Sequence, residues 1–222
     1  NTLIIFLNDN GGPSDANYSI NKPFSGVKGT FYEGGIRVPF TMSWPDRIKA
    51  GTSYDEVISS LDILPTALAA AKAKQLGEKA LDGVDLLPYI NGKNIDGKGT
   101  EDPHEALYWA WDGQYAIRSG DWKYIKTSSH EYLFDVTTAQ QENENLINKN
   151  PELAQILRKK IKAWSHVDII NPGFDNVTTK SGVNFFNHYL NGKPAPYPSK
   201  DIAKDKPKNK SKKKKQKNTL IN

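Results

Sequence analysis

The feature that most constrains the fold is an uninterrupted apolar run near the start of the chain, residues 2–7, with the sequence TLIIFL. A strand that is apolar on both faces belongs inside a sheet that is covered on both sides, as in α/β proteins. Such a strand needs neighbouring strands and helices. Asn1 is not an initiator Met, and no charged leader precedes the run, so we expect the C-terminal piece of a longer α/β protein.

A polar turn, Asp9-Asn10-Gly11-Gly12, follows this strand at its carboxyl end, where open α/β sheets place their ligands. The Asp9 carboxylate and the Asn10 amide carbonyl are hard oxygen donors, which suit Ca²⁺ or Mg²⁺ and do not suit Zn²⁺. The glycines permit the sharp bend that would direct both side chains to one ion. The alternative is an Asx-turn that only leads the chain out of the strand.

The second candidate site residue is Lys28, which stands between small residues in the segment GVKGTFYEGGIRVP, residues 26–39. A compact ammonium held by such a backbone can neutralise a tetrahedral oxyanion as a point charge, which fits a sulfate or phosphate ester. Glu33 and Arg37 are spaced to pair with each other and to fix this loop. The alternative is an ordinary exposed loop lysine.

The rest of the chain divides into a helical part and a β-rich part. Residues 38–44 predict a strand, and residues 62–73 predict a helix with Asp62 as its N-cap. Further on, four short aromatic segments joined by tight turns predict an antiparallel meander. A helix that begins after Asn150 has a one-sided apolar face, and we expect it to pack on the meander. The predicted divisions are residues 1–103, the end of an α/β domain; 104–170, the sheet with its helix; 171–202, an extended segment; and 203–222, a disordered Lys-rich tail.

The net charge of +5 arises in the C-terminal tail, because residues 200–222 hold ten Lys and two Asp, and the remainder is mildly acidic. The tail lysines either bind a polyanion in a salt-dependent way or form a solvated tail without a partner. No aromatic residue is interleaved among them to stack on bases, which argues against single-strand recognition. The chain has no Cys, hence no disulfide or thiolate metal site, and no apolar run long enough for a membrane span.

Several motifs occur in a fixed order along the chain: DNGG at residues 9–12, KGTFYEGGIRVPF at 28–40, SWP at 43–45, LDILPT at 61–66, LDGVDLLP at 81–88, AIRSGDWK at 116–123 and EYLFD at 131–135. In this order they resemble the second half of the type I sulfatases, over roughly residues 2–165. The resemblance implies the C-terminal part of an alkaline-phosphatase-like α/β sandwich, followed by a small antiparallel sheet with a packed C-terminal helix.

The resemblance also implies roles for individual residues. Asp9 and Asn10 would ligate a divalent ion, usually calcium with magnesium as the alternative, and Lys28 would bind the sulfate group of a sulfated small molecule or polysaccharide. Sulfatases of this type attack sulfur with a formylglycine made in a Cys/Ser-x-Pro-x-Arg motif, which we expect upstream. This sequence has no Cys, and its one Ser-x-Pro-x-Arg string, residues 43–47, begins with the SWP segment of the resemblance. Calcium takes about 6–8 oxygens, and two side chains supply only a few of them. We therefore predict that residues 1–222 alone turn over no ester.

Two other functions remain open at this point. One is a phosphodiesterase or phosphonate hydrolase of the same superfamily, and the other is a non-catalytic sulfatase-like protein that binds polyanions through its tail. The resemblance implies a periplasmic or secreted location. His104 and the other histidines lack metal-ligand spacing and are predicted to be surface or packing residues. Trp109, Trp111 and Trp122 are predicted to pack in the core or between subdomains rather than to form a sugar platform.

Overall fold

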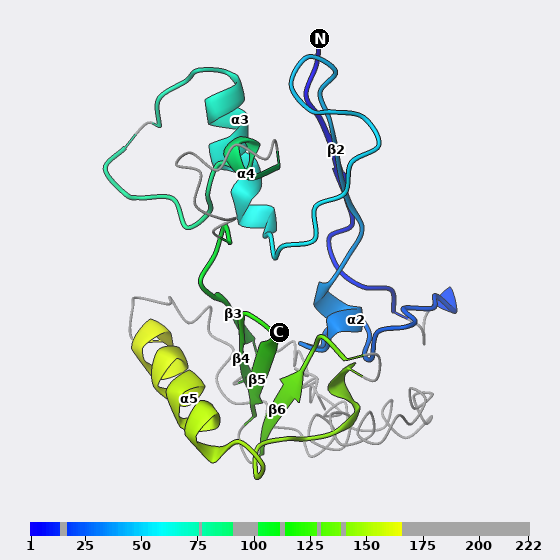
Figure 1. The fold of residues 1–222 in the computed structure, drawn as a ribbon, viewed down its shortest axis with the longest axis vertical. Helices are drawn as coiled ribbons and strands as arrows, with labels where there is room; N and C mark the ends of the chain where they lie inside the picture. Colours follow the sequence, from blue (N-terminus) through cyan, green and yellow to red (C-terminus); the bar gives the residue numbers. More distant parts are fainter. Residues whose placement is uncertain are drawn as a thin grey trace, which may run out of the picture.

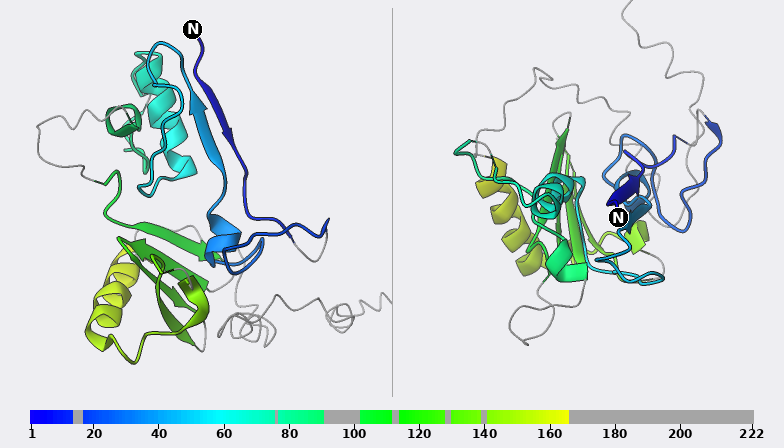
Figure 2. Two further views of the ribbon diagram at one scale, coloured as in Figure 1. Left: turned by 45° about the vertical axis from the view of Figure 1, so that its right-hand side comes forward. Right: turned by 90° about the horizontal axis from the view of Figure 1, so that it is seen from above.

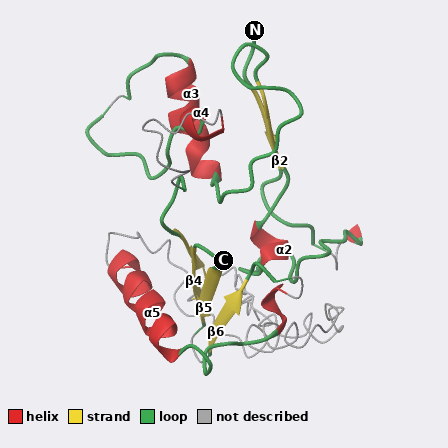
Figure 3. Cartoon of the chain, in the orientation of Figure 1, coloured by secondary structure: helices red, strands yellow, loops and turns green. Residues whose placement is uncertain are grey.

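The computed structural model describes residues 1–13, 17–75, 77–90, 102–111, 114–127, 130–138 and 141–165. The segments predicted at 171–202 and 203–222 lie outside these ranges. An N-terminal two-stranded ribbon, a small group of helices and a C-terminal sheet with one long helix make up the described part (Figures 1 and 3). None of the helices within it has the length and apolar character to cross a bilayer.

The N-terminal apolar run forms strand β1 (Ile4–Leu7), which pairs antiparallel with β2 (Phe40–Ser43). The register places Ile4 opposite Ser43 and Leu7 opposite Phe40, so the predicted strand near residues 38–44 is confirmed. Within the described residues, β1 is not buried on both faces as predicted, because the side chains of Ile4 and Phe6 are 60% and 63% exposed. These two side chains share one face of the ribbon, and only the opposite face is partly buried.

The helical part is organised around a buried carboxylate. Helix α3 (Ile63–Ala70) follows the 3-10 turn η1 (Ser60–Asp62), and α4 (Leu87–Ile90) comes later in the chain. Asp62 occupies the N-cap position of α3, as predicted, but its side chain makes no cap hydrogen bond there. Asp62 instead completes a capping box begun by Ser59, whose backbone N–H it accepts at 2.7 Å.

The same carboxylate also joins two of the sequence motifs. It accepts hydrogen bonds from the backbone of Val84 and from the ring of His104, both at 2.9 Å. Three donors on one buried carboxylate satisfy it more fully than a cap alone would. His104 is therefore a packing histidine, as predicted.

The predicted meander is confirmed as a four-stranded antiparallel sheet in the order β3-β4-β5-β6. A two-residue turn, residues 120–121, joins β4 to β5, and α5 comes after the last strand in the chain. The strands are β3 (Leu107–Trp111), β4 (Gln114–Ser119), β5 (Trp122–Lys126) and β6 (Glu131–Asp135), and the helix is α5 (Pro151–Ser165).

Each face of this sheet has its own core, because side chains alternate along the strands. On one face, the apolar side of α5 packs on the sheet, as predicted (Figure 2). On the other face, Phe31 and Tyr32 pack on the sheet just before helix α2 (Glu33–Ile36). The core residues of the first face are Ile117, Tyr124, Leu133, Ala154, Leu157 and Ile161, and those of the second are Phe31, Tyr32, Ala116, Ile125, Tyr132, Phe134 and Val136. The segment that carries Lys28 therefore leads directly into a layer on the C-terminal sheet.

Candidate functional site

The turn after β1 is docked onto α2 through backbone contacts. The N–H of Gly11 donates to the carbonyl of Gly35 at 2.9 Å. A side chain cannot fit at residue 11, because a Cβ there would lie 1.7 Å from the carbonyl oxygen of Gly34. This close approach requires glycine and fixes Asp9 and Asn10 beside α2.

Asp9 and Asn10 form a partial Asx-type turn but retain oxygen atoms for a ligand. The N–H of Asn10 donates to Asp9 Oδ1 at 3.0 Å, and Asn10 Nδ2 donates to the Gly11 carbonyl at 2.9 Å. These contacts use one carboxylate oxygen of Asp9 and the amino end of the Asn10 amide. Asp9 Oδ2 and Asn10 Oδ1 therefore remain as acceptors of the kind that Ca²⁺ or Mg²⁺ binds.

These two oxygens would make up only part of a metal-binding shell. Among the residues that the structure describes, no group of three or more His, Cys, Asp or Glu side chains could hold a metal. Since calcium takes about 6–8 oxygens, the donor chemistry fits calcium or magnesium while the number of donors is too small for a complete site.

Lys28 lies in a loop that is hydrogen-bonded to the same turn. Its backbone N–H donates to the Gly12 carbonyl at 3.4 Å. Asn21 reinforces this junction, because its side chain accepts from the Gly12 N–H at 2.9 Å and donates to the carbonyls of Gly12 and Gly26 at 2.9 Å and 3.1 Å. The structure thus makes the turn of Asp9 and the loop of Lys28 direct neighbours.

The Lys28 loop is closed by its own backbone and one hydroxyl. Thr30 Oγ1 donates to the Val27 carbonyl at 2.7 Å and accepts from the Val27 N–H at 3.2 Å. The Lys28 side chain is exposed, and among the described ion pairs it takes part in none. Its ammonium is therefore available to an anion, in a loop whose backbone is constrained.

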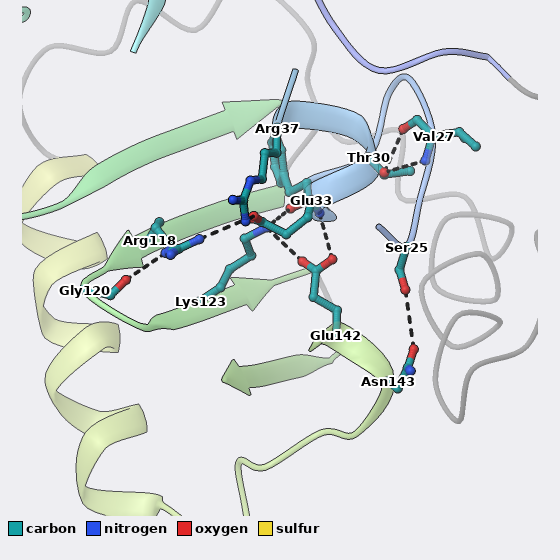
Figure 4. Close-up of polar contacts among 11 residues, drawn as sticks. Ser25, Val27, Thr30, Glu33, Arg37, Arg118, Gly120, Lys123, Glu142 and Asn143 are labelled. Carbon is teal, nitrogen blue, oxygen red and sulfur yellow. Dashed lines mark hydrogen bonds and ion pairs between the residues drawn. The ribbon is translucent and has the colours of Figure 1, made fainter. Parts of the chain in front are cut away.

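Immediately after this loop, the chain is anchored to the C-terminal sheet by Lys123 of β5 (Figure 4). The Lys123 side chain is 0% exposed. Its Nζ donates to Glu142 Oε1 at 2.8 Å, to the Phe31 carbonyl at 3.1 Å and to the Glu33 carboxylate. The N–H of Glu33 in turn donates to Glu142 Oε2 at 2.7 Å. A buried ammonium with three acceptors is fully satisfied, as a buried charge must be.

Two arginines complete this arrangement. Arg118 of β4 lies directly opposite Lys123 in the β4–β5 ladder, and like charges in such positions repel each other. Glu33 resolves the repulsion because its carboxylate binds both, with Arg118 Nη1 at 3.4 Å. The predicted pair of Glu33 and Arg37 is confirmed at 3.6 Å. We call Glu33, Arg37, Arg118, Lys123 and Glu142 the Lys123 cluster.

The two carboxylates of the Lys123 cluster differ in their pKa. Burial by itself would raise the pKa of Glu33, but the attraction of Lys123, Arg118 and Arg37 exceeds this effect, and the pKa is lowered. Burial raises the pKa of Glu142 to about 7, where the repulsion of Glu33 adds to the rise and Lys123 only partly offsets it. The cluster therefore holds one firmly ionised carboxylate and one that titrates near neutral pH.

The sequence predictions included Glu33 but missed Lys123, Arg118 and Glu142. A signal for the two cations was present, because the predicted hairpin places them on the same face as the buried residues Ala116 and Ile125. Two cations on an apolar face require an anionic partner. Glu142 has no comparable signal, since it lies in a polar stretch without periodicity.

Comparison with known proteins adds a family match. The chain matches the sequence model of a family described as N-sulphoglucosamine sulphohydrolase, C-terminal, over residues 27–166. Arylsulfatase A of Bos taurus is 32% identical over 205 residues, which cover 80% of this chain and 39% of that relative. The uncharacterized sulfatase YdeN of Escherichia coli (strain K12) is 27% identical over 217 residues, which cover 80% of this chain and 37% of the relative. The chain thus spans about two fifths of the length of these curated relatives.

A solved structure supports the fold. A protein determined in complex with its substrate D-glucosamine-2-N,6-O-disulfate matches with a TM-score of 0.56 at 23% identity, over 75% of this chain and 35% of that one. The predicted α/β class, with a C-terminal antiparallel sheet and a packed helix, is confirmed.

Proposed function

Since the chain belongs to the sulfatase family, we propose that it supplies part of the active site of a sulfuric ester hydrolase. The observation that carries the proposal is the direct contact between two loops, one with the Asp9–Asn10 oxygens and one with the Lys28 ammonium. Opposite charges on neighbouring, backbone-constrained loops suit a ligand that is itself an anion bound to a cation.

Lys28 has the role of binding the sulfate group. Its exposed ammonium is a point charge with three donors, which suits an anion whose charge is spread over several oxygens. The charge that develops on the transferring group in the transition state is neutralised by the same ammonium, without reorganisation of the loop.

Asp9 and Asn10 have the role of holding the metal, with calcium as the preferred ion and magnesium as the alternative. When bound, such an ion supplies Lewis-acid polarisation of the ester oxygens. Asp9 contributes a charged oxygen and Asn10 a neutral one, and Gly11 keeps both beside α2 through its contact with Gly35.

The nucleophile is assigned to a region outside residues 1–222. The chain has no Cys, and its one Ser-x-Pro-x-Arg string begins at Ser43, which pairs with Ile4 at the end of the β1–β2 ribbon far from Asp9. The substrate class is a sulfate ester of an aryl group, a sugar or a polysaccharide. Polyanion binding by the Lys-rich tail and a periplasmic or secreted location stay predictions.

The test compares two ester types on the full-length protein. We expect hydrolysis of an aryl sulfate, slower hydrolysis of the matched aryl phosphodiester, and no turnover by residues 1–222 alone. A chelator should remove most of the sulfatase activity and added calcium should restore it, because the metal neutralises the ester oxygens. The measurement is the release of the phenol from each ester with and without chelator.

The outcomes separate the competing functions. Faster cleavage of the phosphodiester would favour a phosphodiesterase or phosphonate hydrolase of the same superfamily. Failure to cleave either ester would favour a non-catalytic sulfatase-like protein. Sulfatase activity that a chelator leaves unchanged would contradict the metal role of Asp9 and Asn10.

A further inference from the structure

The chain on both sides of Lys28 is held by two consecutive residues of the 3-10 turn η2 (Gln141–Asn143) (Figure 4). Before Lys28, Ser25 Oγ and Asn143 Oδ1 form a hydrogen bond of 3.4 Å. After Lys28, the N–H of Glu33 donates to Glu142 at 2.7 Å. A displacement of η2 would therefore move both ends of the Lys28 loop together.

The attachment after Lys28 is the stronger of the two. Glu142 is 0% exposed and binds Lys123 as well as the Glu33 backbone, while Lys123 also binds the Phe31 carbonyl. Buried charge-assisted hydrogen bonds are stronger than neutral ones. Glu142, Lys123 and Glu33, which connect η2 to the loop, are all buried. A shift of Glu142 would therefore displace the backbone of the loop and would not act through net charge alone.

The ends of the loop are also tied to each other. The N–H of Gly34 donates to the Ser25 carbonyl at 2.6 Å, which closes residues 25–34 into a compact unit. An exposed lysine pays conformational entropy when it binds an anion, and a loop that is already ordered lowers that cost. Contacts with the C-terminal sheet thus order the Lys28 loop before an anion binds, so the loop loses less conformational entropy on binding.

We propose that Glu142 and Asn143 are positioning residues, which with Lys123 place the Lys28 ammonium for sulfate binding. This inference rests on the proposed function of Lys28. It assigns to η2, far along the chain from Lys28, an effect on the affinity for sulfate.

The test uses inorganic sulfate as a competitive inhibitor of aryl sulfate hydrolysis by the full-length protein. We expect Glu142→Ala to weaken sulfate inhibition by about tenfold or more, because a misplacement of about 1 Å can cost up to about 10²-fold. Glu142→Gln keeps an acceptor and should recover part of the affinity. Glu144→Ala, in the same segment but in an exposed pair with Lys149, is the matched control and should behave as the wild type.

The outcomes distinguish this inference from the proposed function. If Glu142→Ala lowers the thermal midpoint but leaves sulfate inhibition unchanged, Glu142 is structural only and the inference is wrong. If Lys28→Ala also leaves sulfate inhibition unchanged, the role of Lys28 itself is wrong. If Glu142→Ala does not fold, Asn143→Ala removes only the contact to Ser25 and should weaken inhibition about threefold, whereas unchanged inhibition would overturn the inference.

A separate observation concerns Trp111, the last residue of β3. Its side chain is 51% exposed, whereas Trp109 and Trp122 pack against the two cores of the sheet. Its six-membered ring lies on Gly29, where a Cβ would come within 3.3 Å of Cζ3 and 3.5 Å of Cη2. Gly29 directly follows Lys28, so an exposed aromatic surface adjoins the residue proposed to bind sulfate.

We infer that Trp111 forms a wall for the organic part of the sulfate ester. An aromatic face binds planar or sugar rings through apolar contact, and an adjacent ammonium would hold the sulfate at the edge of that face. The contribution concerns the choice of substrate, since Trp111 carries no charge and offers mainly apolar ring surface.

Trp111→Ala in the full-length protein should raise KM for an aryl sulfate by about tenfold and change KM for a small alkyl sulfate and inhibition by inorganic sulfate by less than about twofold. Trp111→Phe should retain most of the aryl preference. Ile156→Ala, an equally exposed apolar residue on α5, serves as the control. Equal effects of Trp111→Ala on both esters, or no effect on either, would overturn the inference.

Discussion

Lys123→Met is expected to lower the free energy of unfolding by about 3–5 kcal/mol, the typical cost of removing one partner from a buried ion pair. The change leaves the buried carboxylates of Glu33 and Glu142 without their shared cation and leaves the Phe31 carbonyl without its donor. Methionine fills a similar volume, so packing contributes little to the loss. Chemical denaturation of the full-length protein measures the effect.

The pH dependence of this loss follows from the two carboxylates. Lys123 lowers the pKa of both, so its removal raises both. If the pKa of a carboxyl group is higher in the folded than in the unfolded protein, the free energy of unfolding falls as the pH rises from the lower to the higher of these two pKa values. The deficit of Lys123→Met relative to the wild type should therefore be smaller near pH 5 and grow toward pH 8.

Two comparisons show whether the buried charge causes the effect. Adding Glu142→Gln to Lys123→Met neutralises the carboxylate that loses its cation, since Glu33 keeps Arg118 and Arg37, and should recover part of the stability. Lys126→Met changes an exposed lysine at the end of the same strand and should cost less than about 0.5 kcal/mol. A loss for Lys123→Met that is below about 1 kcal/mol, or equal at pH 5 and pH 8, would contradict the proposed electrostatic origin.

The Lys123 cluster also shows how far sequence reasoning reaches. The turn residues around Gly120 predict the β4–β5 hairpin, and the hairpin register alone brings Arg118 opposite Lys123. That the partner is Glu33 does not follow from local patterns, because it lies 85 residues from Arg118. Periodicity describes which side chains share a face, whereas the identity of the layer that covers the face depends on tertiary packing.

The N-terminal strand shows the same limit of sequence reasoning: its secondary structure is predictable, but its burial is not. Its continuous apolar run correctly predicts a strand, and the chain bends at Asp9 and Asn10, just before the glycine pair. The run also predicts burial on both faces, yet Ile4 and Phe6 are exposed among the described residues. An apolar pattern indicates that a surface is buried in the protein, but it does not indicate which part of the protein buries it.

The candidate site was predictable only as separate residues. Asp9, Asn10 and Lys28 follow from donor chemistry and motif resemblance, and the contact between their loops depends on Asn21, a residue that no motif singled out. A side-chain amide can bridge two loops from any position that tertiary structure brings near them. Its role becomes evident only when the hydrogen bonds to Gly12 and Gly26 are known.

Lys28→Ala in the full-length protein is expected to lower kcat/KM for an aryl sulfate by about 10²–10³-fold, the usual effect of removing one group that stabilises transition-state charge. The side chain is exposed and takes part in none of the described ion pairs, so the thermal midpoint should stay unchanged. Lys28→Arg keeps the positive charge but replaces the compact ammonium by a planar guanidinium. Its kcat/KM should lie between those of the wild type and Lys28→Ala. Steady-state kinetics with an aryl sulfate measures all three.

The matched control is Lys22→Ala, because Lys22 is an exposed lysine in the same long loop. A general electrostatic attraction between this face and anionic substrates would make both alanine variants lose activity to a similar, small and salt-sensitive extent. A direct contact with the sulfate group would make only the Lys28 variant lose activity, largely independent of salt. Similar losses of activity in Lys22→Ala and Lys28→Ala would therefore refute the sulfate-binding role of Lys28.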